Sequence, residues 1–595
     1  MSYLADIGIT ILIYVILGLS LNLLLGYAGQ VSMAQATFFG IGAYTAGLLT
    51  MPVLVAASTG IAARGVTSGQ GWNWLPGLII ALVVAFLFAS AISAPAARRV
   101  TGEYLILLTL AFQVIANQLM NSLTNVTGGP YGLTPIPPFN GFGQSYIQPE
   151  SVFWIVLGFT VLSFLVARGI AESPFGRVLK GVREDEVAVR ALGKNTVRTK
   201  IVIFGLSAAM AGLAGAIGAY YYQFIAPGNY TLDLSIFMVA VVVLGGTGNL
   251  AGTVVGAVIL GSLRPILQNV PGIGDANSIP WQSVIYGFGL VLMMLFRPEG
   301  ILPEGARLSS LWRRGRPSSS SAGTVPAGSS AARQTSLAPD RPSGEPVVQI
   351  QGLSKNFGGV AAVDKVDINL NRGQITALIG PNGAGKTTIF NLVTGVLKPD
   401  AGRVLVNGID VVGKGPDRIT RMGMTRSFQD VRLFRRITVL QNVAMAVPGQ
   451  AGESPLWLVA NPIQSLRQER KTLASAISYL DFVGMADRRD EVVANLSFGE
   501  QKLVAIARLL ATECGVLLLD EPTSGIDHGA VDRMISLVLD LRKLDKTICI
   551  VEHSVHVVAQ LADRAYFLDQ GRIIQEGTMA ELTSHQHLVE LYFGT

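Results

Sequence analysis

Long apolar segments follow one another through the first half of the chain. Several of them reach the about 20 residues that an α-helix needs to cross a bilayer. Buried helices of a soluble protein are a poor alternative at this density. The segments therefore predict a polytopic α-helical membrane domain, which we place at residues 1–303. They cover residues 7–25, 32–55, 75–94, 104–123, 152–167, 201–224, 234–263 and 281–296.

The pattern changes near residue 347, where short β-rich runs begin to alternate with helix-like stretches. Such alternation predicts an α/β domain, here over residues 347–595, whose chemistry lies at the carboxyl ends of its strands. Residues 304–346 are rich in Ser, Gly, Pro, Ala and Arg and hold too little apolar content to fold, so we expect a flexible linker there. The β-rich runs cover residues 375–379, 515–519, 547–551 and 564–568.

A glycine-rich motif lies near the start of the α/β domain. Residues 380–387 read Gly-Pro-Asn-Gly-Ala-Gly-Lys-Thr and fit the phosphate-binding pattern G-x-x-x-x-G-K-[ST]. The run 375–379 precedes the motif, and a helix-compatible stretch, 388–396, follows it. In such a loop, backbone N–H groups face the phosphates of a nucleotide, and the helix N-terminus adds positive potential. The residues expected to bind ATP are Gly380, Asn382, Gly383, Gly385, Lys386, Thr387 and Thr388.

Metal and hydrolysis chemistry is predicted at two places. We expect Lys386 to place a charge on the γ-phosphate and the Thr387 hydroxyl to ligate Mg²⁺. The apolar run 515–519 ends in Asp520 and Glu521. We expect Asp520 to hold Mg²⁺ through water and Glu521 to polarise the attacking water. On a surface these two carboxylates would be unremarkable, but behind a buried strand and a phosphate loop they predict ATP hydrolysis.

A second anion site is predicted where Leu-Ser-Phe-Gly-Glu-Gln, at 496–501, precedes a helix expected over 502–510. Ser497 and the backbone of Gly499 would present hydrogen-bond donors at the N-terminus of that helix. Taken alone the motif is weak, because a serine before a helix is a common N-cap. Its place between the phosphate loop and the Asp-Glu pair favours the functional interpretation.

Four single residues complete the candidate site. We expect Gln429 to reach Mg²⁺ or the attacking water, and His553, which follows another strand, to contact the γ-phosphate. Taken singly, Gln429 reads as a loop amide and His553 as a structural histidine. Asp527 is a candidate for coupling two sites across a dimer. Phe357 is a candidate to stack on adenine, with core packing as the alternative.

Charge orients the membrane domain. Only 14% of the residues are charged, and we interpret the net charge of +6 as membrane orientation and not as nucleic-acid binding. Arg98, Arg99 and the basic stretch 168–200 should be cytoplasmic, whereas 124–151, which has no Lys or Arg, should lie outside. The ATPase needs cytosolic ATP, so we expect nine passes, or eight with a re-entrant pair. The two cysteines, Cys514 and Cys549, lie in apolar runs and read as reduced core residues.

A glycine-broken repeat supports this number of passes. The run 234–263 contains Leu-Gly-Gly-Thr-Gly-Asn at 244–249, which can divide it into two short passes, and residues 25–32 echo residues 244–251. Such breaks point to a substrate path near the midplane, with Gln30 and Asn249 in matching places. Close packing of helices is the alternative interpretation.

In order and spacing, the phosphate loop, Gln429, the 496–501 motif, the Asp-Glu pair, Asp527 and His553 resemble the ATP-binding cassette of ABC transporters. The resemblance covers about residues 347–595. Residues 421–434 and 496–501 are similar to the cassette of bacterial branched-chain amino acid importers, although Phe498 and Glu500 depart from the common L-S-G-G-Q sequence. About residues 4–302 resemble a permease of the same importers, through the stretches 18–23, 26–30, 38–44, 127–133 and 183–186.

This resemblance implies a fused permease and ATPase subunit of an importer in the bacterial inner membrane, with ATP and Mg²⁺ as cofactors. One cassette cannot complete a site, so a second permease and a second cassette are implied, as separate subunits or as a second copy of the chain. An extracytoplasmic solute-binding protein and membrane lipid are the other expected partners. Branched-chain or related amino acids are the expected solutes. The alternatives are urea, amides or aromatic acids, an exporter half, or a membrane-tethered regulatory ATPase.

The membrane half contains one sizeable cytoplasmic loop, residues 176–195. Within it, Arg-Glu-Asp-Glu-Val-Ala-Val-Arg-Ala-Leu-Gly at 183–193 predicts a short helix between two spans. We expect this loop to dock in a groove of a cassette near Gln429, with a solvated basic loop as the alternative.

Overall fold

The computed structural model describes residues 2–51, 72–99, 102–141, 144–268 and 345–583, together with 281, 284–285, 287–289, 291–293, 295–297 and 299–305. The chain divides into two compact units. The first holds Met1–Arg183 and Val197–Ser318, and the second holds Glu184–Thr196 and Ser319–Thr595. Most of the expected linker, residues 306–344, lies outside the described residues. The domain bounds 1–303, 304–346 and 347–595 stay predictions.

The first unit is helical, and seven of its described helices are long and apolar enough to cross a membrane. The helix α2 (Gln35–Thr50) has 16 residues and is shorter than the predicted segment 32–55. Residues 281–296 are described only in part, so the number of passes stays a prediction. The spans fall on α1 (Ser2–Asn22), α4 (Trp74–Arg99), α5 (Glu103–Ser122), α7 (Pro149–Glu172), α10 (Thr196–Tyr222), α11 (Leu232–Gly245) and α12 (Leu250–Gln268).

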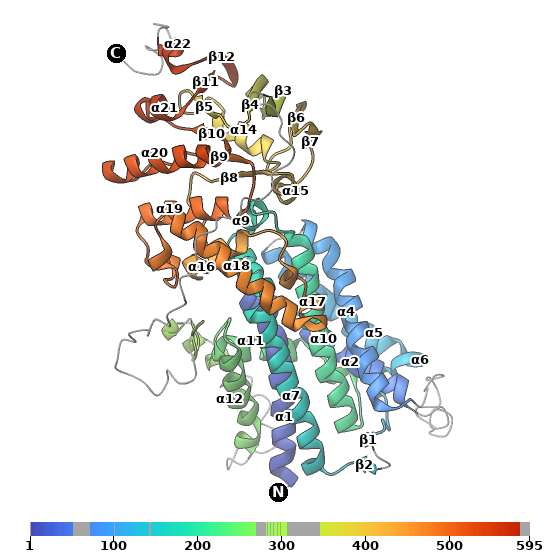
Figure 1. The fold of residues 1–595 in the computed structure, drawn as a ribbon. Helices are drawn as coiled ribbons and strands as arrows, with labels where there is room; N and C mark the ends of the chain where they lie inside the picture. Colours follow the sequence, from blue (N-terminus) through green and yellow to red (C-terminus); the bar gives the residue numbers. More distant parts are fainter. Residues whose placement is uncertain are drawn as a thin grey trace. The chain divides into compact units, whose positions relative to one another are not determined.

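The helices α1 and α10 are the inner helices of this unit. Of their most apolar windows, 67% and 78% are buried, against 28% or less for α4, α5 and α7. The helix α1 packs on α7, α11 and α12, and Figure 1 shows α1 and α7 side by side. The outer helices α4 and α7 expose large apolar side chains such as Leu87 and Trp154, as expected for a surface that a bilayer covers.

Shorter elements connect these helices. A small hairpin and two short helices lie in the charge-poor segment between α5 and α7. These elements are η1 (Leu23–Tyr27), α6 (Thr124–Thr127), η3 (Gly129–Tyr131), β1 (Phe139–Gly141), β2 (Gln144–Tyr146), α8 (Pro174–Glu184) and η4 (Pro227–Asn229).

The predicted break in the run 234–263 is confirmed, because α11 ends at Gly245 and α12 begins at Leu250. The two glycine-broken segments lie against each other. A Cβ on Gly26 would meet the backbone nitrogen of Gly248 at 2.3 Å. Asn22 joins the segments: its Nδ2 donates to the carbonyl of Asn249 at 3.0 Å, and its Oδ1 accepts from the N–H of Gly248 at 2.9 Å. The glycines therefore permit contact of backbone with backbone.

Charged residues surround these turns. Glu304 pairs with Arg183 at 2.7 Å and with Lys180 at 3.0 Å, and Arg183 also donates to the carbonyl of Gly26. Gln30 and Asn249 are 8% and 7% exposed. A basic cluster at the end of α8 marks the cytoplasmic end of the helices and not the middle of the membrane. This arrangement favours the packing interpretation and argues against a path near the midplane.

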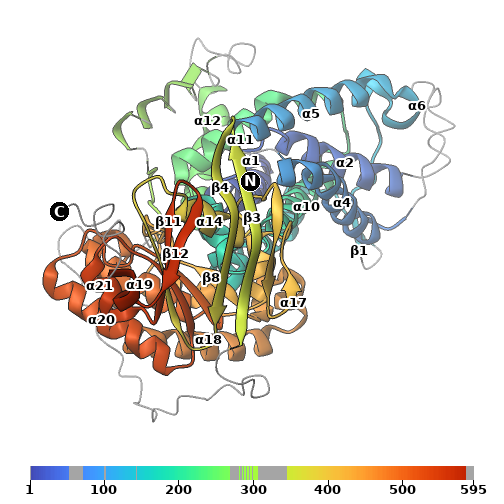
Figure 2. The same ribbon diagram turned by 90° about the horizontal axis from the view of Figure 1, so that it is seen from above.

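The second unit contains two sheets. The six-stranded sheet has the order β12-β11-β5-β10-β9-β8, and the four-stranded sheet has the order β4-β3-β6-β7. In Figure 2, β3 and β4 are the long yellow-green strands. The six-stranded sheet is built from β5 (Ile375–Ile379), β8 (Met424–Arg426), β9 (Val516–Asp520), β10 (Thr547–Val551), β11 (Arg564–Asp569) and β12 (Arg572–Gly577). The other sheet is built from β3 (Pro346–Phe357), β4 (Val360–Asn371), β6 (Ala401–Val406) and β7 (Ile409–Asp410).

Strands β5, β9 and β10 are buried at every residue, as expected for parallel strands covered on both faces. The two cysteines are free and buried, and burial raises the pKa of Cys549, on β10, to about 12. The predicted order of a helical membrane domain and an α/β domain is confirmed. The helices of the second unit are α9 (Glu186–Ala191), α14 (Lys386–Val393), α15 (Pro416–Arg421), α16 (Val439–Ala446), α17 (Pro455–Ala460), α18 (Pro462–Phe482), α19 (Phe498–Leu510), α20 (His528–Lys543), α21 (Val555–Leu561) and α22 (Met579–Thr583), with the short turns η6 (Ala451–Glu453), η7 (Ala486–Arg488) and η8 (Val493–Asn495).

Candidate functional site

Four neighbouring strands bring the candidate residues to one edge of the six-stranded sheet. Strands β5, β10, β9 and β8 are adjacent and parallel, so their carboxyl ends meet at the same edge. The phosphate loop follows β5, and His553 comes shortly after β10. Glu521 follows β9 directly, and Gln429 comes shortly after β8. The topology thus gathers residues that the sequence holds far apart.

The phosphate loop turns tightly before α14, which begins at Lys386 and not at the expected residue 388. Gly385 has φ +106°, and a Cβ there would meet the carbonyl oxygen of Ala362 at 2.4 Å. Lys386 Nζ donates to the carbonyls of Gly380 and Pro381 at 2.8 and 2.9 Å. Burial lowers the pKa of Lys386. The lysine is therefore folded back over its own loop, at the mouth of the predicted phosphate site.

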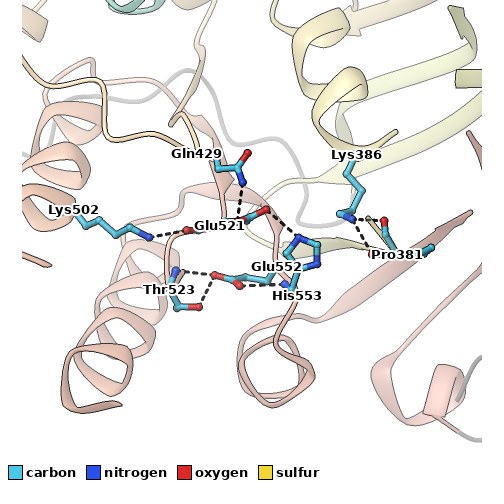
Figure 3. Close-up of polar contacts among 9 residues, drawn as sticks. Pro381, Lys386, Gln429, Lys502, Glu521, Thr523, Glu552 and His553 are labelled. Atoms are coloured by element: carbon cyan, nitrogen blue, oxygen red, sulfur yellow. Dashed lines mark hydrogen bonds and ion pairs between the residues drawn. The ribbon is translucent and has the colours of Figure 1, made fainter. Parts of the chain in front are cut away.

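Two side chains converge on Glu521 from different strands (Figure 3). Gln429 Nε2 donates to Glu521 Oε2 at 3.2 Å, and His553 Nε2 lies 3.0 Å from Glu521 Oε1. The backbone of Glu521 has φ +47°, in the left-handed region that a residue with a side chain rarely adopts. Its N–H donates to the carbonyl of Val551 on β10 at 2.9 Å. The neighbouring strand therefore holds Glu521 in this conformation.

Asp520, the last residue of β9, is a buried carboxylate with few partners. Neither of its oxygens has a hydrogen bond among the described residues, and the guanidinium of Arg426 lies 3.7 Å away. Burial raises the pKa of Asp520 to about 6, against the opposing effect of Arg426. A buried carboxylate without hydrogen bonds is suited to a cation and its water ligands. The chemistry of this carboxylate therefore suits Mg²⁺, and Mg²⁺ binding stays a prediction.

The sequence did not single out two residues that organise this site. Glu552 Oε1 accepts from the N–H and the hydroxyl of Thr523 at 2.8 and 2.6 Å, and Glu552 Oε2 accepts from the N–H of His553 at 3.2 Å. Lys502 Nζ donates to the carbonyls of Glu521, Pro522 and Ser524 (Figure 3). Glu552 thus fixes His553, and Lys502 ties the loop after β9 to the helix α19.

The helix α19, which follows the second predicted anion site, begins at Phe498, four residues earlier than expected. Ser497 forms a capping box: its hydroxyl accepts from the N–H of Glu500, and Glu500 Oε2 accepts from the N–H of Ser497 at 2.9 Å. The Ser497 hydroxyl also donates to Glu500 Oε2 at 2.8 Å. These hydrogen bonds from Ser497 lower the pKa of Glu500. The N-cap interpretation is therefore confirmed for Ser497, and the role of Ser497 and Gly499 in anion binding stays a prediction.

The remaining predicted residues lie at the surface of the second unit. Phe357 ends β3, is 47% exposed, and has Lys355 Nζ at 5.6 Å from its ring centroid. This exposure argues against core packing. Asp527 caps α20 by accepting from the N–H of Ala530 at 3.0 Å. In the phosphate loop, Asn382, Gly383 and Thr387 are exposed, and Thr388 is half-buried.

The segment Glu184–Thr196 belongs to the first half by sequence but packs on the α/β part within the second unit. It forms the short helix α9, which Asp185 caps by accepting from the N–H of Ala188 at 2.9 Å. Glu184 accepts from the N–H groups of Arg435 and Arg436. The predicted short helix is therefore confirmed, and Glu184, the residue before its N-cap, is anchored by backbone donors.

Further contacts fix the other end of this segment. The hydroxyls of Thr420 and Thr425 both donate to the carbonyl of Ala191, at 2.8 and 3.2 Å, and Arg421 Nε donates to the carbonyl of Gly193 at 3.0 Å. Asp185 pairs with Arg432, three residues after Gln429, at 3.2 Å. The predicted docking of this segment on the cassette is confirmed by these contacts, and a groove near Gln429 stays a prediction.

Comparison with known proteins relates both halves of the chain to branched-chain amino acid transport. The family described as branched-chain amino acid transport system / permease component matches residues 3–294, and the ABC transporter family matches residues 363–524. The high-affinity branched-chain amino acid transport ATP-binding protein LivG of Escherichia coli (strain K12) is 34% identical over 251 residues. This match covers 42% of this chain and 98% of LivG.

Two further relatives match over a similar length. The probable LivG of Archaeoglobus fulgidus is 34% identical over 248 residues, covering 42% of this chain and 95% of the relative. BraF of Pseudomonas aeruginosa is described as a high-affinity branched-chain amino acid transport ATP-binding protein. It is 30% identical over 250 residues, which cover 42% of this chain and 98% of BraF. All three are ATP-binding proteins, and the permease match falls on the other half of the chain.

Proposed function

We propose that this chain, which belongs to the branched-chain amino acid transport family of ABC transporters, is the fused permease and ATPase subunit of an importer. The chain is a multi-pass protein of the inner membrane, and it hydrolyses ATP on its cytosolic cassette. Import, and branched-chain or related amino acids as the solute, are the finer parts of the proposal.

One observation carries this proposal: a permease component and an ATP-binding cassette of one transport family lie in the same chain. The docking of Glu184–Thr196 on the cassette supports a mechanical link between them. Arg183 is held by Glu304 and by the carbonyl of Gly26, and the next residue, Glu184, is held by backbone donors of the cassette. Movement of the cassette surface therefore pulls directly on the end of α8.

In the proposed hydrolysis, Glu521 accepts a proton from the water that attacks the γ-phosphate. Gln429 and His553 hold its carboxylate from two sides, which fixes its orientation before ATP arrives. Lys386 exchanges its contacts with the carbonyls of Gly380 and Pro381 for the γ-phosphate. His553 lies where it can contact the same phosphate, and Phe357 presents an exposed ring for adenine.

The rest of the loop binds phosphate through its backbone. Gly380, Asn382, Gly383, Gly385 and Thr388 frame the path of the phosphates. Mg²⁺ would be held by Thr387, Gln429 and Asp520, and it would supply neutralising charge to the phosphates when it is bound with ATP. Gln429 supports this assignment because its amide nitrogen faces Glu521 and its oxygen points away (Figure 3).

A second cassette completes the site. Ser497 and Gly499 lie at the start of α19, whose N-terminus faces a phosphate of the opposite nucleotide in this proposal. The Ser497 hydroxyl then exchanges its bond to Glu500 for that phosphate, and Asp527 links the two sites. The partners are a second permease and a second cassette, supplied as separate subunits or as a second copy of this chain. An extracytoplasmic solute-binding protein delivers the solute.

Vesicle uptake tests the proposal. The purified complex is placed in proteoliposomes with ATP enclosed on the cassette side, and labelled leucine is added on the other side with its binding protein. We expect accumulation that requires both ATP and the binding protein. Uptake that is the same with and without the binding protein, or ATP-driven efflux, would instead indicate an exporter or a regulatory ATPase. A panel containing urea, amides and aromatic acids, measured by calorimetry on the binding protein, separates the solute classes.

A further inference from the structure

An apolar patch lies on the surface of the cassette, at α17 and the start of α18. The patch consists of Leu456, Trp457, Ile463 and Leu466, which are 82%, 40%, 67% and 64% exposed. Large apolar side chains gathered in this way on a water-soluble surface mark a contact site. The family relationship and the hydrolysis site leave this patch without a role.

Exposed basic residues continue the patch along α18. Arg467, Arg470 and Lys471 directly follow the apolar positions, and all three are exposed. Leucine, isoleucine and tryptophan beside lysine and arginine are typical of a segment that lies in the headgroup region of an anionic membrane.

The contacts of Lys194 connect the segment before this patch to the chain that leads into α10. Lys194 Nζ donates to the carbonyl of Val447 at 2.9 Å and pairs with Glu453. Lys194 lies two residues before Thr196, where the membrane-spanning helix α10 begins. Glu453 lies only three residues before Leu456, a separation of at most about 10 Å along the chain.

The length of chain between Lys194 and the apolar part of α10 is short. Its apolar sequence begins at Ile201, after Arg198 and Lys200, which suit the headgroup layer on the cytoplasmic side. From Lys194 to Ile201 the chain reaches at most about 25 Å, and about 10 Å where it is helical. The Lys194–Glu453 ion pair and this short length of chain therefore connect the patch to the start of a membrane-spanning helix.

We propose that the α17–α18 patch is a lipid-binding surface, in which Leu456, Trp457, Ile463 and Leu466 enter the headgroup layer of an anionic leaflet. Arg467, Arg470 and Lys471 pair there with lipid phosphates. The cassette is then held by two attachments, the docked segment Glu184–Thr196 and the membrane surface itself. The proposal goes beyond the transport function and does not depend on the direction of transport or on the solute.

Spin labels in the full-length complex test the depth of the patch. Leu456→Cys and Ile463→Cys are labelled separately, and Ser536→Cys, an exposed position on α20, is the matched control. The natural cysteines are buried and stay in place. Each complex is placed in vesicles of phosphatidylglycerol and phosphatidylethanolamine, and relaxation is measured with oxygen and with a water-soluble nickel chelate.

We expect oxygen to relax the labels at 456 and 463 several-fold more strongly than nickel, and the reverse at 536. Replacing phosphatidylglycerol with phosphatidylcholine should reduce the oxygen-to-nickel ratio at 456 and 463. The triple variant Arg467→Gln, Arg470→Gln and Lys471→Gln should remove that dependence on lipid charge. Retained ATP hydrolysis in each variant verifies that the cassette is folded.

Three results would overturn the proposal. Labels at 456 and 463 that respond to nickel as strongly as the label at 536 would place the patch in water. Immobile labels shielded from both reagents would identify a protein partner, such as the second permease, as the occupant. Oxygen-to-nickel ratios that change neither with the anionic lipid nor in the triple variant would exclude recognition of lipid charge. If the complex fails to import solute, the relaxation of the spin labels still reports the depth of the patch.

Discussion

The molecule contains two polar clusters built from distant segments, and they differ in how their groups are satisfied. The sheet-edge cluster consists of Lys386, Gln429, Asp520, Glu521 and His553. The turn cluster consists of Asn22, Lys180, Arg183, Gly248 and Glu304. In the turn cluster, charges are paired within about 3 Å and the amide of Asn22 uses both ends. In the sheet-edge cluster, the carboxylate of Asp520 has no hydrogen bond among the described residues, its ion pair with Arg426 is 3.7 Å long, and Glu521 has φ +47°.

This difference separates a place for chemistry from a place for packing. A buried carboxylate that has no hydrogen bond and only a long ion pair raises the free energy of the folded state, and a bound cation would lower it. A cluster whose charges and amides are paired has little left to offer a ligand and holds elements together instead. The glycines do not follow this division, because a Cβ on Gly385 would also meet backbone, the carbonyl oxygen of Ala362 at 2.4 Å, as a Cβ on Gly26 would meet the nitrogen of Gly248 at 2.3 Å.

The largest effect should come from removing the charge at the phosphate loop. Lys386→Ala should weaken ATP binding by about 100-fold, because a charge-assisted hydrogen bond contributes about 1.5–3 kcal/mol. Lys398→Ala, an exposed lysine on the same unit, should leave the affinity unchanged. Titration with a fluorescent nucleotide measures both. Equal affinities in the two variants would contradict the assignment of Lys386.

The next effect concerns the buried carboxylate of Asp520. Because burial raises the pKa of Asp520 to about 6, the native state binds a proton that the unfolded state has lost between pH 4 and 6. The stability of the nucleotide-free cassette should therefore fall as the pH rises through this range, by up to about 3 kcal/mol, and stay level above it. Hydrogen exchange at residues 516–520, corrected for intrinsic rates, reports the opening free energy. Asp520→Asn should remove this pH dependence; a slope that persists in the variant would assign it to another group.

Packing at the turns should respond to a single methyl group. In Gly26→Ala the added Cβ meets the nitrogen of Gly248 at 2.3 Å, so the thermal stability of the permease unit should fall by about 1–3 kcal/mol. Gly158→Ala, on α7, has nothing within 4 Å of its new Cβ and should be neutral. ATP affinity should be the same in both variants. A stable Gly26→Ala protein that fails only in uptake would favour the substrate-path interpretation instead.

The smallest effect should come from the ion pairs at the end of α8. Glu304→Gln loosens Lys180 and Arg183 just before the docked segment, so the amount of solute moved per ATP should fall by a factor of about 3–10, which corresponds to about 0.6–1.4 kcal/mol of coupling. Glu299→Gln, an exposed neighbour, should keep the wild-type ratio. Uptake and hydrolysis measured in the same vesicles give the ratio. A parallel loss of both activities would place Glu304 outside the coupling.

Much of the fold could be predicted because its signals are local. The aliphatic runs 375–379 and 547–551 coincide with β5 and β10, since a strand buried on both faces has little freedom in sequence. The break at 244–249 and the helix in 183–193 were also predicted from local patterns. The start of α19 was missed although Ser497 and Glu500 have the spacing of a capping box.

The rest depended on contacts that the sequence order hides. Glu552 and Lys502 organise the site through residues on other strands, so their roles appear only once the sheet is assembled. The turns at Gly26 and Gly248 resemble a ligand path in sequence, because a glycine motif does not show what approaches it. The exposed patch at α17 and α18 was hidden for the same reason, since apolar residues in a helical stretch read as core.

Hydrolysis by Glu521→Gln tests the central claim, that the sheet-edge cluster is where ATP is cleaved. In the purified complex this variant should bind ATP within about threefold of wild type, while turnover falls by at least about 100-fold, because the amide cannot accept a proton. Glu576→Gln, an exposed position on β12, should hydrolyse ATP at the wild-type rate. Turnover close to wild type in Glu521→Gln, with binding intact, would contradict the account.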